Sequence, residues 1–469
     1  MPKQSSIPHA VSSGIKNQSR ILLGYFSNNP VWAMRAAENY LEAGNKSKAK
    51  HFYQKALERV NNSRDTVVLE KRHELQFRIC HGLYQLGVEV ADDPLFKCRV
   101  RPCKSSAGKP AGRYWTAMRP FGLKMKGEVA LEGAACARPE TIDIFLDGNL
   151  IRKERLYFQQ NRASFSFMLK RSTLAHLPEQ SEMVLKTSTG DHLLDNYHKT
   201  NKLLIEMPGG TGKIYEILNQ NLLCKKGFFP LSAEEINQRQ DAYLKLYEKA
   251  RAVFDDMLER PLFLMYGTLL GLYRDGDFIP GDDDFDVGYV SEHRDPVSAK
   301  EEAEKLMIAL IKAGFTVAIN LRGKPFRLRD KDGDPNIHLD VRPIWYQDGR
   351  VWAHKQACLP LQLDDFKQVD TKFLRDTEVY IPSGTEAFLR SYYGENWKTP
   401  DPGFSNSSVS VPVKVMKNLQ RNCFNPVELL KLKESIDKER SLNPEMGEFI
   451  AVGLQSLYPL SEFANKCGL

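Results

Sequence analysis

The sequence lacks a long apolar run, a recognisable secretion signal and any closely spaced cysteine motif. Its longest strongly apolar stretch, Pro261 to Tyr273, is far shorter than the roughly 20 residues that cross a bilayer. Residues 1–20 are polar and contain no apolar core of a signal peptide. The eight cysteines are scattered and form no Cys-x-x-Cys pair, so neither a zinc finger nor a disulfide scaffold is indicated. We therefore expect reduced thiols and a cytoplasmic protein without a membrane anchor, and peripheral association at the inner membrane face stays open.

What the sequence does contain is ordinary globular chemistry with a mild excess of positive charge. Of its 469 residues, 42% are hydrophobic and 27% are charged, and the formal net charge is +7. This composition is sufficient for two to four compact domains. A basic balance suits a phosphorylated substrate, an anionic glycan or an anionic membrane surface, and it also suits nucleic acid. Charge alone therefore does not identify the partner.

Hydrophobic periodicity predicts a multidomain α+β protein. Near the N-terminus, Ala37, Tyr40 and Ala49 recur at tetratricopeptide-like spacing, although only one such helical unit is visible. Further along, the period changes to two and turns such as Asp147-Gly148 separate the runs, which favours a β-sandwich-like domain. The predicted segments are a flexible tail at 1–20, a helical domain at 21–95, the β-sandwich-like domain at 96–200, a catalytic α/β domain at 201–410 and a C-terminal helical extension at 411–469.

A strand–turn–helix junction follows a long predicted helix. Ser232 and Glu235 form a capping-box signature, and a helix is expected over 233–260. The apolar run 261–266 is typical of a buried strand, and Gly267-Thr268 ends it before a second helix opens. A glycine allows close backbone approach and the threonine adds a hydroxyl. Free amides at such a helix start favour a phosphate group.

An aspartate-rich segment comes next, and it carries the predicted metal site. If 283–290 is a strand, Asp284 and Asp286 project from the same face and Asp282 shares their parity. Carboxylates on one face repel each other unless a cation lies between them, and oxygen ligands favour Mg²⁺ or Mn²⁺. The alternative is a solvated acidic turn, which the flanking apolar runs make the weaker interpretation.

A third carboxylate is expected from the predicted strand 336–342. Its inward residues are apolar, and His338, Asp340 and Arg342 share the other face. Asp340 can ligate the metal or take a proton from an acceptor hydroxyl. Arg342 can hold a phosphate, and a cross-strand ion pair is an equally good interpretation of His338 and Arg342.

These motifs together resemble the LicD/fukutin family of the nucleotidyltransferase superfamily. The resemblance rests on Gly267-Thr-Leu-Leu-Gly-Leu-Tyr-Arg274, Phe278-Ile-Pro-Gly-Asp-Asp-Asp-Phe-Asp-Val287 and Tyr393-Gly-Glu-Asn-Trp-Lys-Thr-Pro400. It covers roughly residues 235–405 and assigns the nucleotidyltransferase fold to the catalytic domain. One departure is Gly281, where the family usually has a tryptophan before the aspartates.

The resemblance implies metal-dependent transfer of a phospho-alcohol, such as phosphocholine, ribitol phosphate or glycerol phosphate. The donor would be a CDP-activated alcohol, the acceptor a sugar hydroxyl of a cell-surface glycan such as lipopolysaccharide or capsule, and CMP would be released. Catalysis is expected from Asp284, Asp286 and Asp340. Those three with Asp282 would bind Mg²⁺ or Mn²⁺.

The remaining expectations concern substrate contacts and partners. Gly267, Thr268, Arg274 and Arg342 are predicted to contact substrate, although Arg274 suits a structural ion pair equally well. Association with a membrane or a biosynthetic complex is compatible with the sequence, and nucleic acid is not expected as a partner. The alternatives are a nucleotidyltransferase that releases pyrophosphate and a non-catalytic glycan-binding protein.

Overall fold

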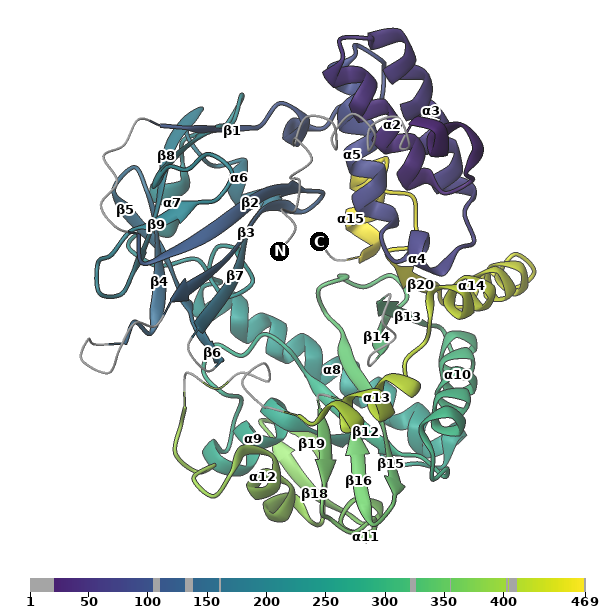
Figure 1. The fold of residues 1–469 in the computed structure, drawn as a ribbon. Helices are drawn as coiled ribbons and strands as arrows, with labels where there is room; N and C mark the ends of the chain where they lie inside the picture. The colour runs from purple at the N-terminus through teal and green to yellow at the C-terminus, as the bar shows by residue number, and fades with distance from the viewer. Residues whose placement is uncertain are drawn as a thin grey trace, which may run out of the picture. The chain divides into compact units, whose positions relative to one another are not determined.

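A computed structural model of the chain describes residues 21–103, 110–130, 138–159, 162–320, 326–354, 356–401, 404 and 411–467 (Figure 1). The predicted tail at 1–20 therefore lies outside the described residues. The chain divides into two compact units, one of residues 1–61 and 73–231, the other of residues 62–72 and 232–469. Both contain helices and sheets, so the protein is a mixed α/β multidomain chain.

The first unit begins with helices whose small and aromatic residues pack together. Residues 21–26 are helical, and α2 (Pro30–Glu42), α3 (Lys46–Asn62) and α5 (Arg72–Gln85) follow. Gly44 has a φ of 76° in the turn between α2 and α3, a left-handed conformation that glycine adopts without steric cost. Ala37, Ala49 and Tyr53 are buried, as expected for residues that pack one helix pair.

Two five-stranded sheets make up the rest of the first unit. One has the order β1-β10-β8-β4-β5 and the other β6-β7-β3-β2-β9. Strands of the two sheets contact each other through β5 and β7 and through β8 and β9. The elements are β1 (Arg99–Pro102), β2 (Gly112–Arg119), β3 (Gly122–Ala130), β4 (Thr141–Leu146), β5 (Asn149–Arg155), β6 (Tyr157–Gln159), β7 (Arg162–Lys170), β8 (Gln180–Thr187), β9 (Leu193–Asp195), β10 (Lys202–Glu206), the 3-10 helix η1 (Pro94–Phe96), and the short helices α6 (Arg171–Leu174) and α7 (Ile214–Leu218).

The first unit extends further along the chain than the sequence predicted. The predicted boundary between residues 200 and 201 precedes β10, which pairs with β1 and β8 inside the first sheet. The structure therefore places the division between Leu231 and Ser232. A pairing between distant strands decides this boundary, and local composition does not reveal such a pairing.

The second unit is built on a mixed sheet with the order β18-β19-β11-β12-β15-β14-β13-β20, in which β16 also pairs with β15 and β17 pairs with β16. Its strands are β11 (Phe263–Leu264), β12 (Asp286–Val290), β13 (Phe315–Asn320), β14 (Phe326–Asp330), β15 (Leu339–Gln347), β16 (Arg350–Ala353), β17 (Ala357–Leu359), β18 (Val369–Leu374), β19 (Thr377–Pro382) and β20 (Phe449–Val452).

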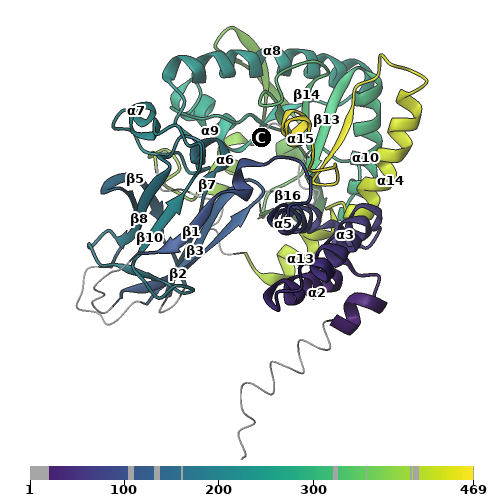
Figure 2. The same cartoon turned by 90° about the horizontal axis from the view of Figure 1, so that it is seen from above.

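Helices cover this sheet and fix its core. They are α4 (Thr66–Leu69), α8 (Ala233–Leu258), α9 (Tyr266–Asp275), α10 (Pro296–Lys312), α11 (Asp364–Lys367), α12 (Thr385–Tyr393), α13 (Val413–Arg421), α14 (Pro426–Arg440) and α15 (Leu460–Cys467). The predicted capping box of Ser232 and Glu235 starts α8 and is confirmed. Figure 2 shows α10 and α14 alongside each other, joined by the ion pairs Lys300–Glu428 (2.9 Å) and Lys312–Glu439 (2.6 Å).

Strand boundaries and the C-terminal segment differ from the predictions. The predicted strand 283–290 begins only at Asp286, and the predicted strand 336–342 begins at Leu339. The predicted helical extension 411–469 also supplies β20, which pairs in parallel with β13. Residues 62–72 join the second unit as well, where Leu69 is in the core and Arg64 pairs with Glu434 at 2.6 Å. Hydrophobic periodicity registers none of these long-range pairings.

The sequence predicted reduced cysteines and no membrane-spanning segment, and both predictions can be compared with the residues that the structure describes. Within the described ranges, seven cysteines are present and none of them forms a disulfide; Cys136 lies outside these ranges. Among the described helices, none has the length and apolar character needed to traverse a bilayer.

Candidate active site

Two aspartates lie side by side at the centre of the second unit's sheet. Strands β12 and β15 are parallel neighbours, and their register pairs Asp286 with Asp340. The Asp340 amide donates to the carbonyl of Phe285 at 2.8 Å, so the pairing continues one residue before β12 begins. Phe285 and Tyr289 pack against aromatic residues of α8, so alternation turns Asp286 to the opposite face of the sheet.

Arg342 lies beneath this pair of carboxylates and neutralises them. Its Nη1 is 2.6 Å from Oδ1 of Asp286, and its Nη2 is 3.2 Å from Oδ2 of Asp340. The side chain is 0% exposed, and its guanidinium lies 5.2 Å from the ring centre of Tyr266. Burial lowers the pKa of Arg342, but the two aspartates outweigh burial and hold that pKa above its usual value. Arg342 is therefore a permanent buried cation.

The three preceding aspartates form a second acidic group. Carboxylate oxygens of Asp282, Asp283 and Asp284 lie within 4.8 Å of one another. Helix α8 holds the backbone of this loop, because Gln240 donates to the Asp282 carbonyl at 3.1 Å and Tyr243 donates to the Asp283 carbonyl at 2.9 Å. Desolvation, followed by the charge of Asp284, raises the pKa of Asp282 to about 9. Crowded, partly buried carboxylates are thus held together against their mutual repulsion.

The start of α9 forms the wall beside these carboxylates. A Cβ atom at Gly267 would lie 3.2 Å from Oδ2 of Asp282, so this glycine brings the backbone close to the acidic loop. The buried Thr268 hydroxyl accepts a hydrogen bond from the Asp286 amide at 2.9 Å and ties the helix to β12. The first turn of α9 therefore lies next to the acidic loop and to the start of β12.

Tyr266 opens α9 in an uncommon backbone conformation. Its φ is 45°, and it is the only aromatic residue with a positive φ in the described part of the chain. Such conformations cost of order 1–3 kcal/mol and cluster at functional sites. The buried Tyr266 ring packs against Tyr392 of α12, with ring centres 4.8 Å apart, and its hydroxyl donates to the carbonyl of His354. These contacts hold the strained residue in place.

Arg342 and Arg274, the two arginines predicted to contact substrate, both form ion pairs, which is the structural alternative that the sequence left open. Arg342 is enclosed and paired with both strand aspartates, so its guanidinium does not face solvent as a phosphate-binding group would. Arg274 forms a two-point pair with Asp275, the next residue, at 2.9 and 2.7 Å. His338 precedes β15 and has its Nε2 3.8 Å from Asp340. The predicted phosphate-binding role of Arg342 does not fit its enclosed position.

Three residues in the site were given no role from the sequence. Arg327 pairs in register with Asp340, has its Nε 3.5 Å from Oδ1 of that residue and is 42% exposed. Asp283 belongs to the acidic loop. Tyr393 of α12 interacts electrostatically with Asp286, Asp282 and Asp284, and burial raises its pKa well above the usual value. Tyr393 begins the third quoted motif, whereas β14 carries no local signal that singles out Arg327.

Gly281 enters the acidic loop with a φ of 77°, and among the described residues other than its two chain neighbours no atom lies within 4 Å of the position of an added Cβ. The left-handed conformation is open to glycine and strained for a bulky residue such as tryptophan. The glycine that replaces the usual tryptophan at this position therefore matches the left-handed backbone conformation of the loop.

The donor set fits a divalent cation. Asp282, Asp283, Asp284 and Asp286 present carboxylate oxygens only, the chemistry that Mg²⁺ and Mn²⁺ prefer. Burial first, and then the neighbouring aspartates Asp284 and Asp286, raise the pKa of Asp282, so placing negative charge on this group is unfavourable. A bound cation would stabilise that charge, and Asp286 can contribute only part of its charge because Arg342 already holds one of its oxygens.

Comparison with known proteins identifies this second-unit region. No curated protein matches the chain. A family model described as the LicD/FKTN/FKRP nucleotidyltransferase domain matches residues 259–374, which include β11, the start of α9, the acidic loop and β15. All eight predicted site residues lie in that range. Residues 259–374 therefore match the LicD-family nucleotidyltransferase domain, and this match indicates a transferase.

Proposed function

We propose that this protein transfers a phospho-alcohol from a CDP-activated donor to a sugar hydroxyl of a cell-surface glycan and releases CMP. The observation that carries this proposal is the assembly of Asp286, Asp340 and buried Arg342 beside the loop Asp282–Asp284 and the start of α9. The family match at residues 259–374 supports a phosphotransferase of this kind.

The reaction would proceed by in-line attack. The acceptor oxygen forms a bond to the distal phosphorus of the donor, the bond from that phosphorus to the bridging oxygen breaks, and CMP leaves. The proton of the acceptor hydroxyl passes to Asp340, whose side chain is 18% exposed beside Asp286. Catalysis then consists of positioning and charge neutralisation, and no cysteine nucleophile is needed.

The residues of the site have distinct roles in the proposed reaction. A divalent cation on Asp282, Asp284 and Asp286 would neutralise the charge that spreads over the phosphoryl oxygens. The α9 amides at Gly267 and Thr268 are suited to the donor diphosphate. Arg342 keeps Asp286 and Asp340 in register and does not itself contact substrate. Tyr393 of α12 interacts electrostatically with the three carboxylates that would bind the cation.

Arg327 takes the phosphate-binding role in this proposal. It is the partly exposed guanidinium next to Asp340, and its 3.5 Å separation from that carboxylate is longer than a strong ion-pair hydrogen bond. An arginine at such a position can form two parallel hydrogen bonds with phosphate oxygens when donor arrives. Asp340 would then keep the Arg327 guanidinium oriented toward the donor phosphate.

We expect Arg327→Ala to raise the KM for the CDP-alcohol about 10- to 100-fold, the loss of a charge-assisted contact of roughly 1.5–3 kcal/mol. Stability should change little because the side chain is partly exposed. Steady-state kinetics and thermal unfolding test both statements. The matched control is Lys372→Ala on the exposed edge strand β18, which should leave KM unchanged. An unaltered KM in Arg327→Ala would remove this residue from donor binding.

The decisive experiment follows the nucleotide product. Purified protein is incubated with CDP-choline, CDP-ribitol or CDP-glycerol, a glycan acceptor and Mn²⁺, and CMP is quantified by chromatography. We expect CMP from one donor and its loss in excess EDTA. Turnover that persists in EDTA would exclude the metal-dependent mechanism. Pyrophosphate release from a nucleoside triphosphate, without CMP from any CDP-alcohol, would establish the nucleotidyltransferase alternative, which uses the same carboxylates.

A further inference from the structure

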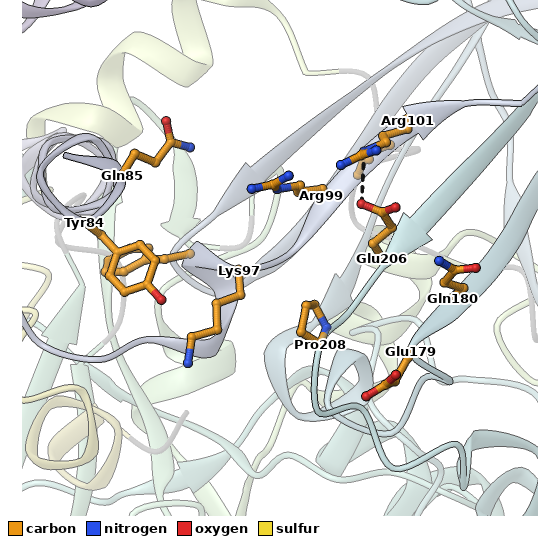
Figure 3. A pocket seen from close by; sticks show the side chains of 11 residues that line it. Tyr84, Gln85, Lys97, Arg99, Arg101, Glu179, Gln180, Glu206 and Pro208 are labelled. Carbon is orange, nitrogen blue, oxygen red and sulfur yellow. Dashed lines mark ion pairs between the residues drawn. The ribbon is translucent and has the colours of Figure 1, made fainter. Parts of the chain in front are cut away.

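The first unit contains a large open cavity, well outside the matched family domain. It has a volume of about 1120 Å³ and lies among α5, η1, the edge strand β1, β8 and the segment around Glu206 (Figure 3). Drug-sized ligands occupy cavities of about 300–1,000 Å³, so this volume suits an extended ligand. All of its lining residues come from the first unit, and none belongs to the acidic site.

Cationic side chains line one wall of the cavity. Arg99 and Arg101 alternate along β1 and share a face of that strand, and Lys97 lies in the turn that precedes it. Arg101 is paired with Glu206 at 3.0 Å, and Lys97 lies 3.5 Å from the exposed Asp92. Within the part of the chain that the structure describes, no carboxylate lies within ion-pair distance of the exposed Arg99. Figure 3 shows Arg99 reaching from β1 toward Gln85 and Tyr84.

The other walls provide an aromatic ring and hydrogen-bonding groups of both kinds. Tyr84 is half-buried and supported from behind by Phe96, with ring centres 5.6 Å apart. Gln85 and Gln180 offer amides, and Glu179 and Glu206 offer carboxylate acceptors. A flat ring beside mixed donors and acceptors suits a polyhydroxyl ligand, since sugar hydroxyls donate to carboxylates and accept from amides and guanidinium groups.

The charge balance narrows the ligand class. Three cations and two carboxylates line the cavity, so the lining carries a surplus of one positive charge, and Arg99 is the lining cation without a carboxylate at ion-pair distance among the described residues. Closely spaced phosphates of a nucleic acid would meet Glu179 and Glu206, and like charges in a partly enclosed site repel. A ligand with one acidic group among several neutral hydroxyls matches this pattern.

We propose that this cavity binds an acidic oligosaccharide, with Arg99 holding a carboxylate or phosphate of the sugar chain and Tyr84 stacking on a ring. The site would hold a glycan independently of the catalytic carboxylates and would bring a polymeric acceptor to the enzyme. It goes beyond the proposed transfer reaction, because binding at the cavity needs neither a CDP-alcohol nor a metal.

Calorimetry on the full-length protein tests the assignment with three sugars. They are a hyaluronan hexasaccharide, which carries carboxylates, a phosphomannan oligosaccharide, which carries phosphate, and the neutral maltohexaose. We expect at least one of the two acidic sugars to bind, the neutral sugar to bind at least about tenfold more weakly, and binding to weaken as salt increases. The acidic sugar that binds more tightly distinguishes a carboxylate from a phosphate ligand.

Variants locate the binding. Arg99→Glu should weaken the acidic sugar at least about tenfold, because an exposed cation is replaced by a repelling charge. Tyr84→Leu keeps an apolar contact with Phe96 and should also weaken binding through loss of the flat ring. The matched control is Arg155→Glu, an exposed arginine on β5 at the opposite edge of the same sheet. Circular dichroism verifies that each variant is folded.

Several outcomes would overturn the assignment. These are no binding of either acidic sugar, equal binding of maltohexaose, or equal weakening by Arg155→Glu. Competition by a poly-glutamate peptide as strong as that of the sugar would indicate an acidic protein segment instead. Sugar binding that persists in Asp284→Asn and in EDTA supports the cavity, whereas failure to release CMP affects only the proposed transfer reaction. The two proposals can therefore fail separately.

Discussion

Asp284→Asn is expected to reduce phospho-alcohol transfer by about 10³-fold or more and to stabilise the metal-free protein. The activity loss corresponds to roughly 4 kcal/mol in the barrier, as expected when a charge that supports transition-state neutralisation is removed. The stability gain has a separate cause. Asp282, Asp283 and Asp284 lie within 4.8 Å of one another, so removing one negative charge relieves repulsion by about 1 kcal/mol or more.

The expected loss of activity and gain of stability have opposite signs, and this combination makes the experiment specific. Without metal, Asp284→Asn should unfold a few degrees above the wild type, on the order of 2–4 °C per kcal/mol for a domain of this size. With saturating Mn²⁺, the wild type should gain stability and the variant should gain much less. The control Asp370→Asn, on the exposed strand β18, should change neither activity nor metal response. Lower stability of metal-free Asp284→Asn would contradict the crowded-carboxylate description.

Arg342→Met is expected to cause the largest loss of stability of any single change in the site. The substitution keeps apolar volume but leaves Asp286 and Asp340 side by side without their buried cation. Breaking a buried ion pair by removing one partner costs about 3–5 kcal/mol. Thermal or urea unfolding should report a drop of this size, and activity should be lost even at temperatures where the variant is folded.

The corresponding control uses a less buried pair. Arg274→Met removes a partner of Asp275, whose side chain is 33% exposed and can be hydrated, so a loss of only about 1 kcal/mol is expected. Combining Arg342→Met with Asp340→Asn should recover part of the stability, because one of the two uncompensated carboxylates disappears. If Arg342→Met were as stable as Arg274→Met and the double variant gave no recovery, Arg342 would not be the neutralising group.

The sequence was most informative where chemistry is local. Ser232 and Glu235 predicted the start of α8, and that start is confirmed because a capping box involves residues three positions apart. The Gly267-Thr268 junction and the aspartate series were recognisable for the same reason, and they identified the family domain before any fold was known. The roles assigned to these residues stay predictions until the product and metal experiments are done.

The sequence was least informative where distant segments meet. The alternation of residues predicted a strand position for Asp284, but β12 begins at Asp286, so Asp284 belongs to a loop held by α8. The sequence also did not distinguish phosphate binding from an ion pair for Arg342, because that distinction depends on the burial of its side chain against β12 and β15. Arg327 gave no signal, since only the pairing of β14 with β15 brings it to Asp340.

By itself, the sequence determined the chemical type of this protein: a glycine-threonine turn, a series of carboxylates and the family pattern that joins them. These features follow from residue identity and short spacing, and both can be recognised without knowledge of the fold. Only the tertiary structure decided which cation neutralises Asp286 and Asp340, which arginine beside Asp340 is partly exposed, and where the first unit has a cavity. Burial and strand register control those properties, and both are set by contacts between residues far apart in the chain.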